Sequence, residues 1–235
     1  MSEGSDKPDG PPVGGGTEVI AADVANEWGE NSGLPIELPG GHDRYEVEGE
    51  IARGSMGIIK KVHDLALRRS VALKQLRPDC TVPGASTRFL DEARITAQLQ
   101  HPGIVAVYEI GVGSDAMPYF TMQLVEGRTL GQLLTAVSAG EPEVLRRYPR
   151  VRLLNLFVQV CMAVAYAHNR GVIHRDLKPD NIMLGEFGEV FVMDWGLAKI
   201  TTTEVAQPVV GGRPEDASFG TRVGDITGTP AYMSP

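Results

Sequence analysis

Apolar and polar residues alternate in short runs over the first half of this chain, and this pattern predicts a small sheet lobe. Five of these runs, bounded by glycine, proline or charged turns, are typical of strands. They are Tyr45–Arg53, Ile58–Val62, Ser70–Leu76, Val105–Gly111 and Tyr119–Val125. Apolar residues at helical spacing predict one helix at Ser86–Leu99, which ends before His101-Pro102-Gly103.

The pattern becomes helical after residue 126. A short helix is expected at Thr129–Val137. A long and largely apolar one, which must be buried, is expected at Val151–His168. The run Asn169-Arg170-Gly171 is a C-terminal signal for the long helix. Two short strand-like runs follow at Ile182–Leu184 and Val190–Met193, and no internal repeat is visible. The predicted elements together indicate an α+β fold.

The N-terminal residues differ from the rest in composition and charge. The first 16 are rich in glycine and proline and lack bulky apolar side chains, so they cannot offset the entropy of ordering. Residues 1–40 hold eight acidic side chains against Lys7, a charge of −7, which leaves −1 of the chain's −8 for the remainder. Ile20, Val24 and Trp28 share one face of a short helix that is either transient or a docking motif. We expect a disordered acidic tail at 1–40.

Overall composition restricts the class of protein. A length of 235 residues, with 42% hydrophobic and 22% charged residues, is typical of a globular protein of one large domain or two small ones. The nearly neutral body argues against nucleic acid as a partner. Cys80 and Cys161 lack disulfide or metal-site spacing, which favours a reducing, cytoplasmic location. No signal peptide is visible, and no apolar run is expected to be long enough for a membrane span.

The run His174-Arg175-Asp176-Leu177-Lys178-Pro179-Asp180-Asn181 is the strongest chemical signal in the chain. Its side chains suit phosphoryl transfer, because an aspartate can accept a proton, a lysine can hold a phosphate and an asparagine can bind a metal ion. The alternative is a polar turn around Pro179. The density of charge in so short a loop favours the chemical interpretation.

Two further features support the same chemistry. The turn Gly54-Ser55-Met56-Gly57 lies between predicted strands, and glycines let backbone N–H groups approach phosphate oxygens. By itself this turn indicates no more than an ordinary hairpin. Downstream, the otherwise apolar strand that contains Val71-Ala72-Leu73 also holds Lys74, which faces inward and needs a partner. Glu92 on the following helix is the natural candidate.

These motifs resemble those of eukaryotic-like Ser/Thr protein kinases, a class also found in bacteria, over residues 45–235. The resemblance implies a bilobal fold with a five-stranded antiparallel N-lobe carrying one helix at residues 45–123. A partial, mostly helical C-lobe would follow at residues 124–235 and end in the P+1 loop. It also implies transfer of the γ-phosphoryl group of ATP to Ser or Thr hydroxyls of a protein substrate. The cofactor would be Mg²⁺, with Mn²⁺ as an alternative.

The resemblance also assigns roles to individual residues. The catalytic set would be Asp176 as base, Lys178 beside the transferred phosphate, Lys74 on the α- and β-phosphates, Glu92 holding Lys74, and Thr229. Asn181 and Asp194 would hold the metal ions. The ATP-binding residues would be Ile51, Gly54, Ser55, Gly57, Ile59, Ala72, Lys74, the gatekeeper Met122, and the backbone of Gln123 and Val125. His174 is expected to be structural and to pack under Trp195.

The chain resembles the Ser/Thr-specific members of the family and departs from the family pattern at two positions. Lys178, Thr229 and the run Gly228–Pro235 resemble the Ser/Thr-specific pattern, in which Thr229 would bond Asp176 and Lys178. Ala52 replaces the first glycine of the phosphate loop, and Trp195 replaces the usual phenylalanine of the metal motif. We expect function to survive both changes.

The end of the chain leads to two further expectations. It stops at Pro235, one residue before the acidic residue that anchors this lobe in the family. We therefore expect a fragment whose activity belongs to a longer parent protein. One hypothesis is that this parent is anchored to a membrane through a C-terminal region missing from the fragment. Without the rest of the C-lobe, the helix at 151–168 is expected to expose a large apolar face.

Regulation is expected to involve the segment between Asp194 and Pro235. An arginine directly before the catalytic aspartate, here Arg175, usually needs an anionic partner, to which Lys199 would be a second cation. The candidate partners are phosphorylated Thr221 or Thr227, or Asp225. Asp225 either supplies part of this charge permanently or is a simple turn residue. A homodimer for autophosphorylation is a further expectation.

Two functions compete with an active kinase. A pseudokinase would bind nucleotide without turnover, but such a protein has typically lost at least one of Lys74, Glu92, Asp176, Asn181 and Asp194, and all are present. In the second alternative, the acidic tail at residues 1–40 is the functional part of the protein, and the kinase-like domain only carries it.

Overall fold

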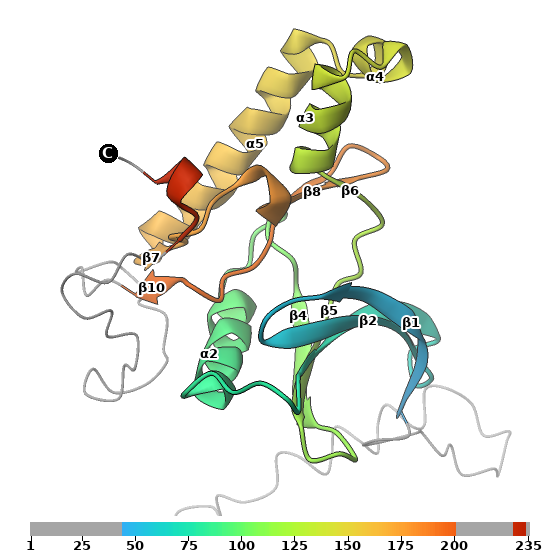
Figure 1. The fold of residues 1–235 in the computed structure, drawn as a ribbon, viewed down its shortest axis with the longest axis vertical. Coiled ribbons are helices and arrows are strands. Elements are labelled where there is room, and N and C mark those ends of the chain that lie inside the picture. The colour runs from blue at the N-terminus through green and yellow to red at the C-terminus, as the bar shows by residue number, and fades with distance from the viewer. Residues whose placement is uncertain (1–43, 201–227, 234–235) are drawn as a thin grey trace, which may run out of the picture. The chain divides into compact units, whose positions relative to one another are not determined.

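The computed structural model describes residues 44–200 and 228–233 (Figure 1). The expected acidic tail therefore lies outside the described residues. The first described elements form an antiparallel five-stranded sheet in the order β1-β2-β3-β5-β4, as the sequence predicted. Its strands are β1 (Tyr45–Arg53), β2 (Gly57–Asp64), β3 (Arg69–Leu76), β4 (Val107–Val112) and β5 (Pro118–Met122).

Strand β5 is shorter than predicted and ends at Met122 instead of Val125. The residues that follow leave the sheet and connect it to the second part of the fold (Figure 1). Strand β2 is longer than predicted, because its pairing with β3 extends to Asp64 opposite Arg69. Apolar pattern alone underestimates β2, since its last residues are polar.

Helix α2 (Ala85–Gln98) packs on the sheet through one apolar face, as its spacing predicted. Phe89 and Ala93 are buried on that face, and the ring centroid of Phe89 lies 5.1 Å from that of Phe120 on β5. Glu92 is also buried, one residue before Ala93. Apolar packing therefore holds α2 on the sheet, and the same helix carries one buried carboxylate, that of Glu92.

An ion-pair network fixes the start of β1 against the other strands. The Arg44 guanidinium donates two hydrogen bonds to Asp64, at 2.9 and 2.8 Å, and one to Glu109 at 2.8 Å. The Asp64 carboxylate also accepts the backbone N–H groups of Ala66 and Leu67 and is almost fully buried. The hydrogen bonds from Arg44 outweigh the effect of burial and lower the pKa of Asp64.

Replacing Asp64 with asparagine is expected to destabilise the fold at neutral pH by about 2–3 kcal/mol, since it leaves part of a buried network unpaired. A carboxyl with a lowered folded pKa stabilises the fold above its ordinary pKa. That contribution is lost as pH falls through the folded pKa. The difference between wild type and Asp64→Asn in urea unfolding should therefore shrink below about pH 4. Glu143→Gln, which breaks an exposed pair, should change little; a pH-independent Asp64→Asn effect would contradict the electrostatic explanation.

The second part of the fold is mainly helical and contains two small sheets. Its helices are α3 (Leu130–Ser138), α4 (Pro142–Arg147) and α5 (Arg150–Asn169), with short 3₁₀ turns η2 (Pro179–Asn181) and η3 (Pro230–Tyr232). Its strands are β6 (Gly127–Thr129), β7 (Val172–Ile173), β8 (Ile182–Gly185), β9 (Val190–Val192) and β10 (Lys199–Ile200). They pair as β6-β8-β9 and β10-β7.

Local sequence explains some of these elements better than others. Helix α3 starts as predicted because Thr129 and Gln132 form a capping box, each side chain bonding the other's backbone N–H. Helix α4 and strands β6, β7 and β10 were not predicted. Each is six residues or shorter, too short for a period to show in the sequence.

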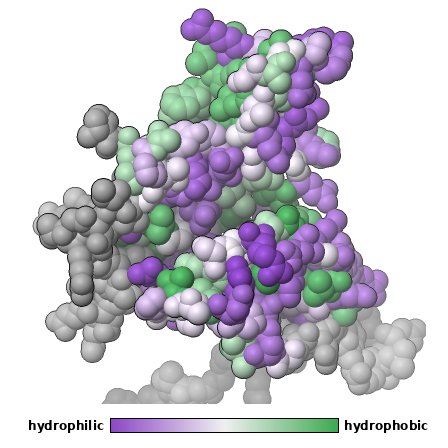
Figure 2. All heavy atoms as spheres, in the orientation of Figure 1, coloured by the Kyte–Doolittle hydropathy of each residue, from purple (hydrophilic) through white to green (hydrophobic). Residues whose placement is uncertain are grey.

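One face of α5 is buried and the other is exposed, so the prediction of a buried helix holds for one face only. Leu156, Val160, Ala163 and Ala167 lie in the core. The expected apolar surface is present, and Figure 2 shows hydrophobic residues gathered over α5. The large exposed apolar residues of this helix are Val151, Leu154, Phe157, Val158 and Met162.

By length and composition alone, α5 could also cross a membrane, contrary to the expectation that no run is long enough. The helix contains so few polar residues that its mean hydropathy stays as high as that of a membrane-spanning helix. One such helix among the described residues is weak support for a membrane span, because core helices meet the same criterion.

Candidate active site

The loop between β7 and β8 supplies Asp176 and Lys178, and Thr229, directly before η3, joins them in one hydrogen-bonded group. The Lys178 ammonium donates to Asp176 Oδ2 at 2.8 Å and to Thr229 Oγ1 at 3.0 Å. Thr229 in turn donates to Asp176 Oδ1 at 2.6 Å. The Asn181 amide donates to the backbone carbonyl of Asp176 at 2.8 Å and to its Oδ2 at 3.2 Å. Thr229 therefore bonds the carboxylate of Asp176 although the two residues lie 53 positions apart in the sequence.

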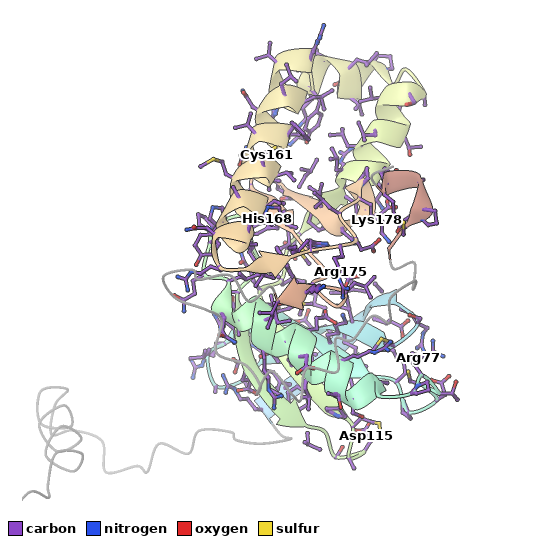
Figure 3. The ribbon with its side chains drawn as sticks, turned by 90° about the vertical axis from the view of Figure 1, so that its left-hand side faces the viewer. Arg77, Asp115, Cys161, His168, Arg175 and Lys178 are labelled. Atoms are coloured by element: carbon purple, nitrogen blue, oxygen red, sulfur yellow. The ribbon has the colours of Figure 1, made fainter. Side chains whose placement is uncertain are left out.

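This group keeps Asp176 ionised. Burial alone would raise the pKa of Asp176, but the hydrogen bonds from Lys178 and Thr229 outweigh it and lower that pKa. The same contact with Asp176 raises the pKa of Lys178. The loop therefore holds a carboxylate that can accept a proton and an ammonium that stays charged beside it. Figure 3 shows Lys178 and the neighbouring Arg175 in this region of the fold.

His174 anchors the loop through both of its ring nitrogens. Its Nε2 lies 2.8 Å from the carbonyl oxygen of Met193, so Nε2 must carry the proton, and Nδ1 accepts the backbone N–H of Asp176 at 3.3 Å. Burial lowers the pKa of this imidazole, which keeps it neutral. Its ring lies 4.6 Å from the buried ring of Trp195, as the sequence predicted.

Lys74 and Glu92 form a nearly buried ion pair between β3 and α2. The Lys74 Nζ lies 2.5 Å from Glu92 Oε1. Burial raises the pKa of Glu92, and the attraction of Lys74 opposes that effect. A Cβ added at Gly196 would lie 3.1 Å from Glu92 Oε2 and 3.2 Å from Asp194 Oδ1, so this pair is close to Asp194 as well. A side chain at position 196 would therefore have to displace Glu92 or Asp194 slightly. Sequence reasoning gave Gly196 no role, although a glycine directly after Asp194-Trp195 was the available signal.

Asn181 and Asp194 suit a magnesium site. The bonds of the Asn181 amide nitrogen to Asp176 leave its carbonyl oxygen as the atom that can meet a cation. Asp194 has a φ of 57°, a strained conformation for a non-glycine residue and one that clusters at functional sites. Within the described ranges, no group of three or more His, Cys, Asp or Glu side chains could hold a metal ion. Mg²⁺ often takes only one or two protein ligands and completes its shell with phosphate oxygens and water, which an asparagine and an aspartate could provide for.

The predicted ATP-binding residues come from strands β1, β2, β3 and β5, from the turn between β1 and β2, and from the segment after β5. Gly54 and Gly57 close a turn by the bond from Gly54 N–H to the Gly57 carbonyl, at 2.9 Å, with Ser55 between them. Ala72 and Met122 face each other in the buried part of β3 and β5. On the other two strands of this region, Ile51 is half exposed and Ile59 is partly buried.

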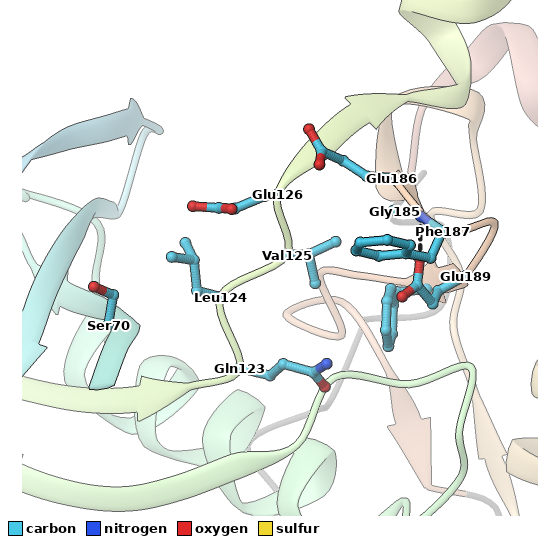
Figure 4. A pocket seen from close by; sticks show the side chains of 10 residues that line it. Ser70, Gln123, Leu124, Val125, Glu126, Gly185, Glu186, Phe187 and Glu189 are labelled. Carbon is cyan, nitrogen blue, oxygen red and sulfur yellow. Dashed lines mark hydrogen bonds between the residues drawn. The ribbon is translucent and has the colours of Figure 1, made fainter. Parts of the chain in front are cut away.

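The segment after β5 also borders a pocket of about 350 Å³. Gln123 and Val125 lie on it, together with Glu126, the turn between β8 and β9, and Ser70 (Figure 4). None of the four residues Lys74, Asp176, Asn181 and Asp194 lines this pocket, so it is separate from the catalytic group. The Gln123 N–H bonds the Ala106 carbonyl at 2.9 Å, which leaves the Gln123 carbonyl as the backbone group able to meet a ligand.

The regulatory candidates are only partly described. Arg175 has a φ of 66°, and its Nε donates to the Leu197 carbonyl at 2.6 Å. Lys199 is exposed in β10. The three candidate anionic partners, Thr221, Asp225 and Thr227, lie outside the described residues. The structure also shows that Gly228, at φ +120°, packs so closely on the Arg175 carbonyl that a Cβ would lie 2.6 Å away.

Comparison with known proteins agrees with this geometry. Residues 45–235 match the family described as "Protein kinase domain", and the chain belongs to this family. It is 39% identical over 214 residues to the "Serine/threonine-protein kinase PknD" of Protochlamydia amoebophila, covering 88% of this chain and 21% of that protein. It is 42% identical over 207 residues to the protein of the same name in Chlamydia muridarum, covering 82% and 22%.

These matches confirm the resemblance to bacterial Ser/Thr protein kinases and the kinase-like α+β fold. The chain spans about a fifth of the length of these curated relatives. ATP and Mg²⁺ are the usual substrate and cofactor of the family.

Proposed function

We propose that this chain is the catalytic domain of a Ser/Thr protein kinase, which transfers the γ-phosphoryl group of ATP to hydroxyls of a protein substrate. The observation that carries the proposal is the hydrogen-bonded group of Asp176, Lys178 and Thr229, with Asn181 bonded to the same aspartate. No structural turn needs an ionised carboxylate, a lysine and a threonine from distant segments in one place.

The protein's own groups divide the work of the reaction. Asp176 accepts a hydrogen bond from the substrate hydroxyl and orients its oxygen toward the γ-phosphorus. The new O–P bond forms as the bond between the γ-phosphorus and the bridging oxygen breaks, and the hydroxyl proton passes to the Asp176 carboxylate. Lys178 lies beside this carboxylate and can stabilise the equatorial oxygens of the transferred group. Mg²⁺, when bound at Asn181 and Asp194, would neutralise charge on the phosphates.

Lys74 holds the α- and β-phosphates in this proposal, and Glu92 keeps it in place. The pair is nearly excluded from water, with side-chain exposures of 15% and 9%, so the lysine is positioned before ATP binds. The carbonyl of Gln123 and the backbone of Val125 would bond adenine. The turn of Gly54, Ser55 and Gly57 would cover the phosphates. The Gly54 N–H closes the turn on the Gly57 carbonyl, so the N–H groups offered to phosphate would be those of Ser55 and Gly57.

The test of this function is incorporation of γ-labelled phosphate from ATP into a generic protein substrate by the complete protein that carries this sequence. Acid hydrolysis of the product should release phosphoserine and phosphothreonine. Phosphotyrosine as the main product would contradict the substrate class. Nucleotide binding without any label transfer would favour the pseudokinase.

Thr229→Ala is expected to lower kcat/KM for a serine peptide by about tenfold, because the hydroxyl that bonds both Asp176 and Lys178 is lost. Thr229→Ser keeps that hydroxyl and should stay within about threefold of wild type. Steady-state kinetics with a synthetic serine peptide measures both variants. Equal losses in the two would show that the threonine methyl group, not the hydroxyl, is what the site requires.

A further inference from the structure

Arg77 connects two segments that border the proposed phosphate site. It follows β3, in the loop that leads to α2 (Figure 3). Its Nη1 donates to the carbonyl oxygen of Gly54 at 3.1 Å, and its backbone N–H donates to the carbonyl of Met56 at 2.9 Å. One residue therefore bonds the backbone of the glycine turn at two points.

Asp79 holds the Arg77 guanidinium in the orientation that reaches Gly54. The two Asp79 oxygens accept Arg77 Nε at 2.8 Å and Nη2 at 2.5 Å, which leaves Nη1 directed at the turn. A bidentate pair of this kind fixes the plane of a guanidinium, which a single bond does not. The Cys80 N–H bonds the Arg77 carbonyl at 3.1 Å and tightens the same loop.

Apolar packing ties the same two segments together. Met56 of the glycine turn packs on the core cluster that contains Phe89 of α2. Cys80 and Val82 of the loop pack on that cluster too. The turn, the loop and the start of α2 therefore share both a charged bridge on the surface and an apolar contact beneath it.

We propose that Arg77, held by Asp79, is a positioning residue for nucleotide binding: it fixes the Gly54–Gly57 turn before ATP arrives. A turn with two glycines loses much conformational freedom when its N–H groups order around phosphates. Holding the turn in advance reduces that loss and so strengthens binding. The proposal rests on the proposed kinase function for its ligand, but the state of the turn can be measured without any nucleotide.

Arg53 provides a matched control on the same turn. Its guanidinium is also exposed and also bonded to one carboxylate, through Nε and Nη2 to Glu50 at 3.0 and 2.6 Å. Within the described residues, its side chain donates to Glu50 and to no backbone carbonyl of the turn. Arg53→Met therefore removes the same charge near the same site but leaves the bridge from Arg77 to Gly54 intact.

The experiment compares Arg77→Met, Asp79→Asn and Arg53→Met in the complete protein that carries this sequence. The measurements are amide exchange at residues 54–57 without nucleotide, ADP affinity by calorimetry, and KM for ATP with kcat. Arg77→Met should speed exchange in the turn, weaken ADP binding and raise KM by about five- to tenfold, with kcat within about twofold of wild type. Asp79→Asn should cause about half that effect on a logarithmic scale, because Arg77 stays but is no longer oriented.

Arg53→Met should leave exchange in the turn unchanged and ADP affinity within about twofold. Equal losses of ADP affinity in Arg53→Met and Arg77→Met would overturn the proposal, since local charge would then explain both. Unchanged exchange at residues 54–57 in Arg77→Met would also overturn it. Failure of the kinase function is distinguishable from either: wild type would then transfer no phosphate, whereas the exchange comparison would still report on the bridge.

Discussion

Replacing Asp176 with asparagine is expected to lower kcat for phosphoryl transfer by about 10²–10⁴-fold, the usual contribution of a general base. Asparagine can still accept the bond from Lys178 through its carbonyl oxygen and can donate through its amide nitrogen to the Thr229 hydroxyl, so the shape of the site should survive. It has no carboxylate to take the hydroxyl proton. Single-turnover kinetics with labelled ATP and a serine peptide measures the loss in the chemical step.

Binding and folding separate this result from simple damage to the protein. Asp176→Asn should keep the wild-type affinity for ADP within about threefold. Asp115→Asn, the same substitution in the exposed turn between β4 and β5, should leave kcat unchanged. If Asp176→Asn retained more than about a tenth of wild-type kcat, Asp176 would not be the base.

Replacing Trp195 with alanine is expected to destabilise the protein by about 3–5 kcal/mol, the cost of removing a large buried aromatic side chain. Trp195 is only 1% exposed, packs on His174 and donates its indole N–H to the Val192 carbonyl at 3.3 Å. The cavity would open beside the residue that precedes it, Asp194, so activity should fall together with stability. Urea unfolding at neutral pH measures the change.

Trp195→Phe tests whether the larger ring is needed here. Phenylalanine keeps most of the apolar contact but loses the indole hydrogen bond, so the expected cost is about 1–2 kcal/mol. Phe187→Ala is the control, because that ring is 93% exposed and should contribute less than about 0.5 kcal/mol. A Trp195→Ala loss no larger than that of Phe187→Ala would show that the core has rearranged around position 195.

The sequence by itself determined the identity of the domain and most of its regular structure. Strand β1 and helix α2 follow from local apolar spacing, and the loop from His174 to Asn181 is contiguous, so its chemistry is visible without coordinates. The pairing of Lys74 with Glu92 was also predictable, because a lysine on an apolar strand needs a partner and the next helix offered one. These features depend on neighbours a short distance along the chain.

The tertiary structure decided what depends on contacts between distant segments. The bond from Lys178 lowers the pKa of Asp176, and the bond from the distant Thr229 adds to this effect. The neutral state of His174 depends on burial, which lowers its pKa against the opposing effect of the Met193 carbonyl. The bond from Arg77 to Gly54 joins residues 23 positions apart and has no periodic signal in the sequence. Apolar pattern records which side chains avoid water, whereas these bonds depend on where the folded backbone places individual polar atoms.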